Sequence, residues 1–414
     1  MTRADPAAED PLRWRLLGIV ATGELLGMAP WFSASAVAPL IASEWGLDRL
    51  GLPALTIAVQ LGFAVGALAL AATAAADVLP ARALFAGGAL LAAAANLGFA
   101  FVAHDAASAI PFRVVTGLAL AGVYPIGLKL LAGWFVRERG LAIGVLVGAL
   151  TVGSALPYLF RAVGASQGLD WRLTVAAASV ASVIGGAIVL AGASNGPWDV
   201  PAPRFSLDVA RSAFRSPSVR LANLGYLGHM WELYAMWTWV PLFLAASFAA
   251  GGLRDPGSAS LAAFVVVGAG GIGCVAAGFL ADRLGRTTLT MVAMAISGTC
   301  AIAVGFLFGA APIVTLVIAL VWGVTVVADS AQFSTAISEL APPGTAGSAL
   351  AIQTAVGFLL TGVTILGVGL LGPADGTGWR VAFGLLALGP LVGIVAMARL
   401  RRRPEAAFMA NGHR

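Results

Sequence analysis

An imidazole and a carboxylate stand three residues apart inside a long apolar stretch, at His229 and Glu232. This spacing places both side chains on one face of a helix. Imidazole gains and loses a proton near neutral pH, so the pair is suited to carrying protons. Asp329 shares a helix face with Gln332 in another apolar stretch and offers a second carboxylate. We expect proton coupling at His229, Glu232 and Asp329; the alternative is a buried His229–Glu232 hydrogen bond that only locks helix packing.

Basic side chains lie inside apolar stretches of the first half, at Arg113 and Lys129. Such groups bind small anions through charge-assisted hydrogen bonds. Glu24 lies roughly 12 Å along its stretch at 1.5 Å per residue, where contact with lipid is costly. Simpler roles stay open, namely an interface anchor at Arg113, a side chain reaching the surface at Lys129 and an ion pair at Glu24. The expected substrate-binding residues are Arg113, Lys129, Glu24, Tyr226, Trp231 and Gln332.

Patterns typical of enzyme active sites are absent from the sequence. It contains no Ser-His-Asp, HExxH or P-loop pattern, and His104 and His413 lie outside the apolar stretches. The two cysteines, Cys274 and Cys300, have no metal-binding or redox spacing. We therefore expect a protein that is not an enzyme, with no catalytic residue, no metal and no cofactor.

The elements that position these residues are long apolar stretches. Of the 414 residues, 59% are hydrophobic and 10% are charged, whereas a soluble domain carries roughly 25% charged residues. About twelve stretches approach the roughly 20 apolar residues that a membrane span needs. This predicts an all-α integral membrane fold with twelve transmembrane helices in two pseudo-symmetric six-helix bundles. The predicted spans are roughly 16–41, 53–76, 83–103, 109–133, 141–165, 172–193, 219–248, 258–281, 288–309, 313–336, 346–371 and 380–400.

A polar, proline-containing segment at 194–218 divides the chain and predicts a cytoplasmic linker. The first bundle would then occupy 1–193, the second 219–403, and a short cytoplasmic tail 404–414. Basic residues gather at one set of stretch ends, which places both termini in the cytoplasm by the positive-inside rule. The same distribution accounts for 24 basic against 19 acidic residues without a nucleic-acid partner. We expect a multi-pass protein of a bacterial cell inner membrane.

The two halves repeat each other. The sequence Gly168, Trp171 and Arg172 recurs as Gly376, Trp379 and Arg380, each time just before the last span of its half. Repeats of one topology, related by an axis along the membrane normal, are a known plan of transporters. The sequence therefore favours two bundles around a central pathway.

The loop after the eighth predicted span carries Gly278, Asp282, Arg283, Gly285 and Arg286, while the first-half copy keeps an aspartate, Asp77, and one basic residue, Arg82. The loop resembles the signature loop of the major facilitator superfamily. The stretch from Arg113 to Gly117 resembles the second motif of that family. The resemblance covers the whole chain and implies that spans one, four, seven and ten line a central cavity. The residues it implies for gating are Asp77, Gly278, Asp282, Arg283, Gly285 and Arg286.

The residues of the fifth predicted span help to indicate which branch of the family the chain resembles. It contains Gly144, Gly148, Gly153 and Pro157 but lacks the Gly-Pro pair of the drug/proton antiporters. Together with the arginine in span four, it looks more like the branch of nitrate/nitrite porters and cyanate permeases. The denser glycine ladder of the nitrate porters is missing, so nitrate itself is not indicated.

These patterns together predict a secondary active transporter that works by alternating access. We expect proton-coupled symport of a small organic or inorganic anion. One alternative is proton-coupled efflux of a hydrophobic or cationic compound, with Glu24, Glu232 and Asp329 as its sites. Another is a membrane sensor that moves nothing. The expected partners are a small-molecule substrate, protons and membrane lipids, and the expected state is a monomer.

Overall fold

The computed structural model describes residues 10–48, 50–136, 138–199 and 205–413. Helices dominate this part of the chain, and it contains no β-strand. Eleven helical stretches in it are long and apolar enough to cross a membrane, which makes the protein a multi-pass membrane protein. The twelfth, at the start of the chain, is broken into pieces of which the longest has 16 residues.

Ten helices form the first half. They are α1 (Leu12–Gly27), α2 (Ser33–Ala36), α3 (Ala38–Trp45), α4 (Gly51–Thr73), α5 (Ala75–Val78), α6 (Ala81–Phe101), α7 (Ala106–Leu120), α8 (Tyr124–Ala132), α9 (Arg139–Ser166) and α10 (Trp171–Gly192). A short helix, α11 (Leu207–Ala213), lies between the halves. Spans one and four are each divided, span one into α1–α3 and span four into α7 and α8.

The second half has a similar order of helices. Its helices are α12 (Pro217–Ala250), α13 (Pro256–Gly268), α14 (Gly270–Leu284), α15 (Arg286–Phe306), α16 (Pro312–Val326), α17 (Ser330–Leu340), α18 (Ala346–Leu371), α19 (Gly376–Leu386) and α20 (Leu388–Arg401), followed by the 3₁₀ turns η1 (Pro404–Phe408) and η2 (Ala410–Gly412). Spans eight, ten and twelve each consist of two consecutive helices.

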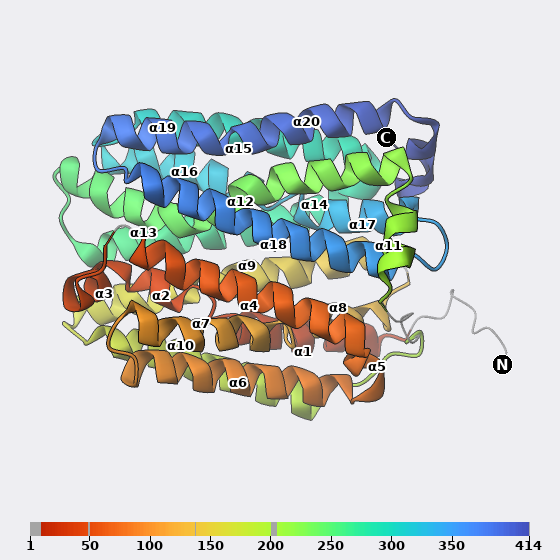
Figure 1. Cartoon of the computed structure of the whole chain (residues 1–414), viewed down its shortest axis with the longest axis horizontal. Helices are drawn as coiled ribbons and strands as arrows, with labels where there is room; N and C mark the ends of the chain where they lie inside the picture. The colour runs from red at the N-terminus through yellow and green to blue at the C-terminus, as the bar shows by residue number, and fades with distance from the viewer. Residues whose placement is uncertain (1–9, 49, 137, 200–204, 414) are drawn as a thin grey trace.

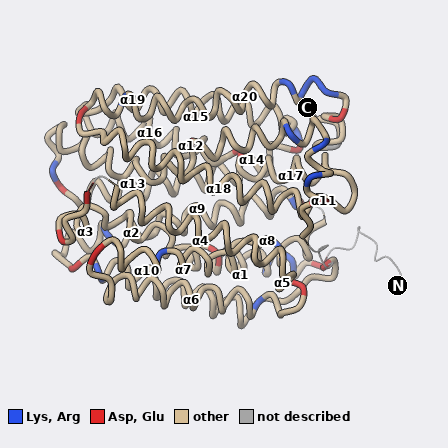
Figure 2. Tube along the Cα trace, in the orientation of Figure 1, with Lys and Arg blue, Asp and Glu red and all other residues tan. Residues whose placement is uncertain are grey.

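The spans run side by side, with the first half below and the second half above in Figure 1. The helices α5, α11 and α17 mark one end of the bundle, here called the linker end, and α3 marks the opposite end, here called the α3 end. Acidic and basic residues gather at both ends, and few lie between them (Figure 2). This is the charge distribution expected when apolar side chains face lipid.

Aspartates fix where several helices begin at the α3 end. Asp105, Asp255 and Asp375 accept hydrogen bonds from backbone N–H groups in the first turns of α7, α13 and α19. These contacts satisfy backbone donors that have no partner within the helix. The hydrogen bonds from Ser108 also hold the pKa of Asp105 below its ordinary value.

The halves meet closely along α9 and α14 because glycines line the contact. A Cβ atom at Gly144 would lie 2.7 Å from the Cys274 carbonyl oxygen, and one at Gly278 would lie 2.6 Å from the Gly140 oxygen. No side chain fits at these distances. Small residues at such contacts let membrane helices pack backbone against backbone. On the other side of the bundle α4 meets α18, where Phe63 and Phe358 pack with ring centroids 4.6 Å apart.

Candidate functional site

A cavity of about 350 Å³ lies between the two halves. Six helices supply most of its wall: α4, α8 and α9 from the first half and α12, α17 and α18 from the second. Within the described residues, α1 contributes none of the lining, although the family resemblance implied that span one would. The aromatic residues in the wall are Phe63, Tyr124, Phe205, Tyr226, Tyr234, Trp237 and Phe358.

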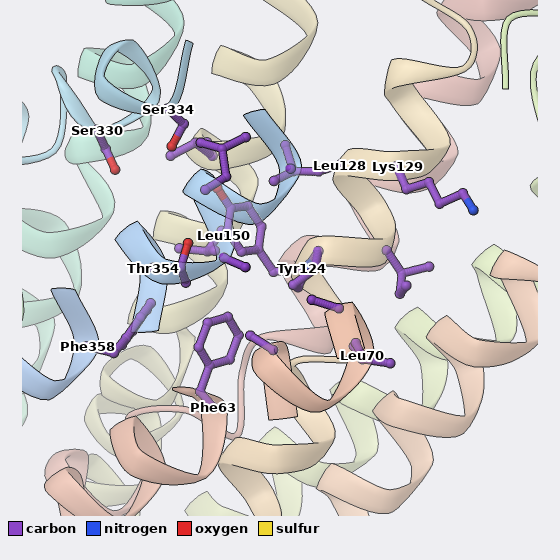
Figure 3. Close-up of a pocket in the computed structure, with 18 of the residues that line it drawn as sticks. Phe63, Leu70, Tyr124, Leu128, Lys129, Leu150, Ser330, Ser334, Thr354 and Phe358 are labelled. Atoms are coloured by element: carbon purple, nitrogen blue, oxygen red, sulfur yellow. The ribbon is translucent and has the colours of Figure 1, made fainter. Parts of the chain in front are cut away.

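Polar atoms are few in this wall and come from both halves. Ser330, Ser334 and Thr354 bring hydroxyl groups from α17 and α18, as Figure 3 shows. Asp77 and Lys129 bring charge from the linker end of the first half. The arrangement suits a solute with a flat apolar body and a small number of polar groups.

An aromatic cluster packs between the halves beside the cavity. Trp31 lies in the break of span one, and its ring centroid is 4.9 Å from Phe63 and 5.7 Å from Tyr234. Phe358 packs against Trp31 as well, at 5.8 Å. Since Trp31 and Phe63 belong to the first half and Tyr234 and Phe358 to the second, the cluster joins the halves.

The segment between the halves crosses the linker end of the cavity. The Phe205 backbone N–H donates to the Ala71 carbonyl of α4 at 3.4 Å, and the next N–H, of Ser206, donates to Ser348 Oγ of α18 at 3.2 Å. The Phe205 side chain is part of the cavity wall. The predicted linker therefore also lines the site, a role that its polar composition did not indicate.

Arg113 holds the break in span one. Its guanidinium donates to the Pro30 and Trp31 carbonyl oxygens at 3.2 and 2.5 Å. It also donates to Ser33 Oγ at 3.1 Å and to Asn96 Oδ1 at 2.9 Å. These partners are neutral oxygens, the side chain is buried, and it is not part of the cavity wall described here. The sequence suggested an anion-binding role, whereas the contacts are those of a clamp on span one.

Lys129 and Asp77 come together at the cavity's linker end. The Lys129 amine donates to the Ala76 carbonyl oxygen and pairs with the Asp77 carboxylate. Figure 3 shows the amine turned away from Tyr124 and Thr354. Lys129 of α8, predicted to bind solute, and Asp77 of α5, predicted to act in gating, thus form one ion pair.

His229 meets Asp329 rather than Glu232. His229 Nδ1 lies 2.8 Å from Asp329 Oδ1, close enough for an ion pair when the ring is protonated, although the two atoms lack the alignment of a hydrogen bond. Glu232 instead accepts hydrogen bonds from Ser297 Oγ and Trp322 Nε1, both at 2.8 Å. The three-residue spacing on α12 is real, but different helices surround its two side chains.

Glu24 is a buried carboxylate with no hydrogen-bond partner among the described residues. It lies on α1 against α8, where a Cβ atom at Gly127 would be 2.8 Å from Glu24 Oε2. The side chain is fully buried. It is not among the described residues that line the cavity.

The remaining candidates separate into two places. Tyr226 lines the cavity. Trp231 faces away, donating from Nε1 to the Leu385 carbonyl oxygen at 3.0 Å. Gln332 accepts from Arg286 at 2.8 Å and so belongs to the signature loop rather than to the cavity.

The signature loop is organised around Arg286. Its Nε and one terminal nitrogen donate to the two carboxylate oxygens of Glu339 at 2.7 and 2.6 Å, and the same terminal nitrogen lies 3.3 Å from Asp282 Oδ1. Gly285 has φ of 84°, a backbone conformation that favours glycine. Arg283 stacks its guanidinium 4.2 Å from the Phe279 ring centroid. Glu339 was not predicted from the sequence. Its position at the linker end of span ten, next to a basic loop, could have indicated a partner for Arg286.

The sequence of this chain is similar to those of known membrane transporters. The family model described as Major Facilitator Superfamily matches residues 20–365. A gallate transporter of Pseudomonas putida is 26% identical over 91% of this chain and 87% of its own length. The MFS transporter asaE of Aspergillus flavus is also 26% identical, but the match spans 46% of this chain and only 42% of that protein. The Fujikurins efflux protein of Gibberella fujikuroi matches with the same identity over 40% of its length.

Solved structures share the fold. The D-xylose-proton symporter superposes with a TM-score of 0.73, covering 95% of this chain and 99% of its own at 16% identity. A bacterial homologue of the human lysosomal transporter Spinster, inward-facing and unoccupied, gives 0.68 over 95% and 97% of the two chains at 15% identity. The family model thus confirms the expected family and the solved structures confirm the fold class, while the nitrate/nitrite and cyanate branch stays a prediction.

Proposed function

Because this chain belongs to the major facilitator superfamily, we propose that it is a secondary active transporter for a small organic anion with an aromatic body. The solute would bind in the central cavity, and the two halves would rock around it by alternating access. The observation that carries the proposal is the cavity itself, since it lies between the halves and joins aromatic walls to a few polar groups.

Size and chemistry support this class of solute. Binding sites for small molecules usually measure roughly 300–1,000 Å³, and the cavity measures about 350 Å³. Tyrosine and phenylalanine rings from both halves offer stacking surfaces, and the hydroxyl groups of Ser330, Ser334 and Thr354 offer hydrogen bonds. Lys129 is the cation in the described wall, and an incoming carboxylate would compete with Asp77 for it. The relative named a gallate transporter points to the same chemical class.

Proton coupling is assigned to the His229–Asp329 pair. The pair is buried between α12 and the start of α17, and its neighbours in sequence, Met230 and Ser330, line the cavity. Ionisable groups are retained inside membrane proteins chiefly for function. Symport would follow if protonation of the pair favours the conformation that binds the solute.

The second candidate is proton-coupled efflux of a hydrophobic compound. It is favoured by the mostly apolar wall and by the relative named an efflux protein. In this case the Lys129–Asp77 pair would stay closed during transport, and charge on the solute would not matter.

Proteoliposomes distinguish the two. An acidic exterior should drive accumulation of gallate or a related hydroxybenzoate, and a protonophore should abolish it. Neutral aromatic compounds of the same size should not accumulate. If these carboxylates neither accumulate nor stabilise the purified protein against heat, while neutral hydrophobic compounds do, the efflux function is the right one.

A further inference from the structure

The segment after the last span, Pro404–His413, packs into the linker end of the second half. Ala406 and Met409 are fully buried and belong to the main hydrophobic core, whereas Phe408 between them is 70% exposed. The turns η1 and η2 contact α17 and α14. The sequence predicted a short cytoplasmic tail here, and in the structure this segment packs against the bundle.

One backbone group of this segment reaches the signature loop. The Ala410 N–H donates to Glu339 Oε2 at 3.3 Å, the same oxygen that accepts from Arg286 Nε. Ala410 has φ of 46°, in the left-handed region that a side chain disfavours. Such a conformation persists only where the surroundings impose it, and buried Met409 beside it supplies that constraint.

Arg286 stands between two carboxylates. Glu339 holds it through two short contacts of 2.6 and 2.7 Å, while Asp282 meets it only at 3.3 Å. A bidentate arginine–carboxylate pair is the stronger arrangement. Whatever holds Glu339 in place therefore limits how closely Arg286 approaches Asp282, which it meets at 3.3 Å.

Asp282 in turn faces the other half of the molecule. A Cβ atom at Gly140, in the first turn of α9, would lie 3.5 Å from Asp282 Oδ2. The N-terminal end of a helix carries a partial positive charge that favours a carboxylate. Asp282 thus contributes to the contact between α14 and α9, and a tighter pair with Arg286 would weaken that contribution.

We propose that the Pro404–His413 segment is a positioning element for the contact between the halves. Met409 and the Ala410 N–H hold Glu339 on Arg286, and this leaves the Asp282 carboxylate available to the start of α9. Loosening the segment shifts Arg286 toward Asp282 and opens α14 from α9 more often. The inference rests on the alternating-access mechanism proposed above, because it concerns how often the halves separate.

The protein's own thiol reports on this contact. Cys274 lies where α14 meets α9, and its Sγ is 3.9 Å from Thr151 Oγ1 of α9. Its rate of alkylation by N-ethylmaleimide in proteoliposomes, measured in a Cys300→Ser parent, rises when the two helices separate. Met409→Ala and Glu339→Gln should each speed alkylation about fivefold, a shift typical of losing one stabilising contact. Met409→Leu, which keeps a large apolar side chain, should be alkylated at the parental rate. Phe408→Ala, at the exposed neighbouring residue, should also be alkylated at the parental rate.

A double variant separates this role from general loosening. Asp282→Asn should speed alkylation by itself, and adding Met409→Ala should change nothing further if the segment acts through Asp282. Independent, multiplying effects would overturn the proposal, as would parental rates in both Met409→Ala and Glu339→Gln. The assay uses neither solute nor pH gradient. A protein that labels as described but moves no carboxylate would therefore refute the proposed function and leave this inference standing.

Discussion

His229 Nδ1 and Asp329 Oδ1 lie 2.8 Å apart, and each side chain is only 1% exposed. The pair links α12 to the residue just before α17 and is packed among apolar neighbours such as Phe333, whose ring centroid lies 5.5 Å from that of His229. A proton gained or lost here changes the charge between two helices that both line the cavity. We have proposed that a pH gradient acts on the solute site through this pair.

Replacing Asp329 by asparagine keeps its size and removes its carboxylate. Gradient-driven uptake by Asp329→Asn should fall about tenfold, equivalent to about 1.4 kcal/mol. Solute exchange across vesicles without a gradient should persist, because the cavity is intact. Both rates are measured in proteoliposomes with radiolabelled carboxylate.

Glu232→Gln serves as the matched control, since it alters a buried acid on the same helix. Its hydrogen bonds to Ser297 and Trp322 indicate a structural role. This variant should lose about 1–3 kcal/mol of unfolding free energy yet retain gradient-driven uptake. Parental gradient-driven uptake in Asp329→Asn would show that the coupling site lies elsewhere.

Arg113→Ala should destabilise the fold. It leaves the Trp31 carbonyl oxygen without its Arg113 donor, while the Ser33 hydroxyl still lies within hydrogen-bond distance of the Pro30 and Asn96 oxygens. The expected loss of unfolding free energy is about 3 kcal/mol. Arg113→Lys should recover little of it, because a single ammonium cannot reproduce the forked geometry. Unfolding in detergent followed by tryptophan fluorescence measures the change. If Arg113→Ala unfolded like the parent protein but lost carboxylate binding, the anion-binding role expected from the sequence would be the right one.

Trp31→Leu should open the α3 end of the pathway. The substitution removes ring contacts to Phe63, Tyr234 and Phe358 that join the two halves. Passive loss of preloaded solute from vesicles should therefore rise about fivefold. This corresponds to a loss of about 1 kcal/mol in the free energy that favours the closed state of that end. Trp14→Leu is the control, because Trp14 is partly exposed near the start of the described chain. Equal leakage from the two variants would mean that the aromatic cluster is not the barrier.

Much of the architecture could be predicted because a helix that crosses a lipid bilayer needs roughly 20 predominantly apolar residues. The helix α18 covers Ala346–Leu371, the range predicted for span eleven, and the other spans agree within a few residues. The divided first span was not predicted. Its break follows from Pro30 together with Arg113, and a hydrogen bond between residues 83 positions apart leaves no local signal.

The site was harder to predict than the spans, because helix periodicity says which residues share a face but not which helix that face meets. His229 and Glu232 illustrate the limit, since they share the three-residue spacing yet contact Asp329 on one side and Ser297 on the other. The aromatic wall was mostly missed for the same reason. Among its tyrosines only Tyr226 stood out in the sequence, in a segment rich in charged and aromatic residues.

If solute passes through the cavity between the halves, as proposed, filling that cavity should block transport. Ala351 lines the cavity on α18, whereas Val356 on the same helix is 42% exposed at the outer surface. Gradient-driven uptake of gallate or a related hydroxybenzoate into proteoliposomes should be lost in Ala351→Trp and unchanged in Val356→Trp, with both variants folded. Uptake by Ala351→Trp at the parental rate would contradict the account.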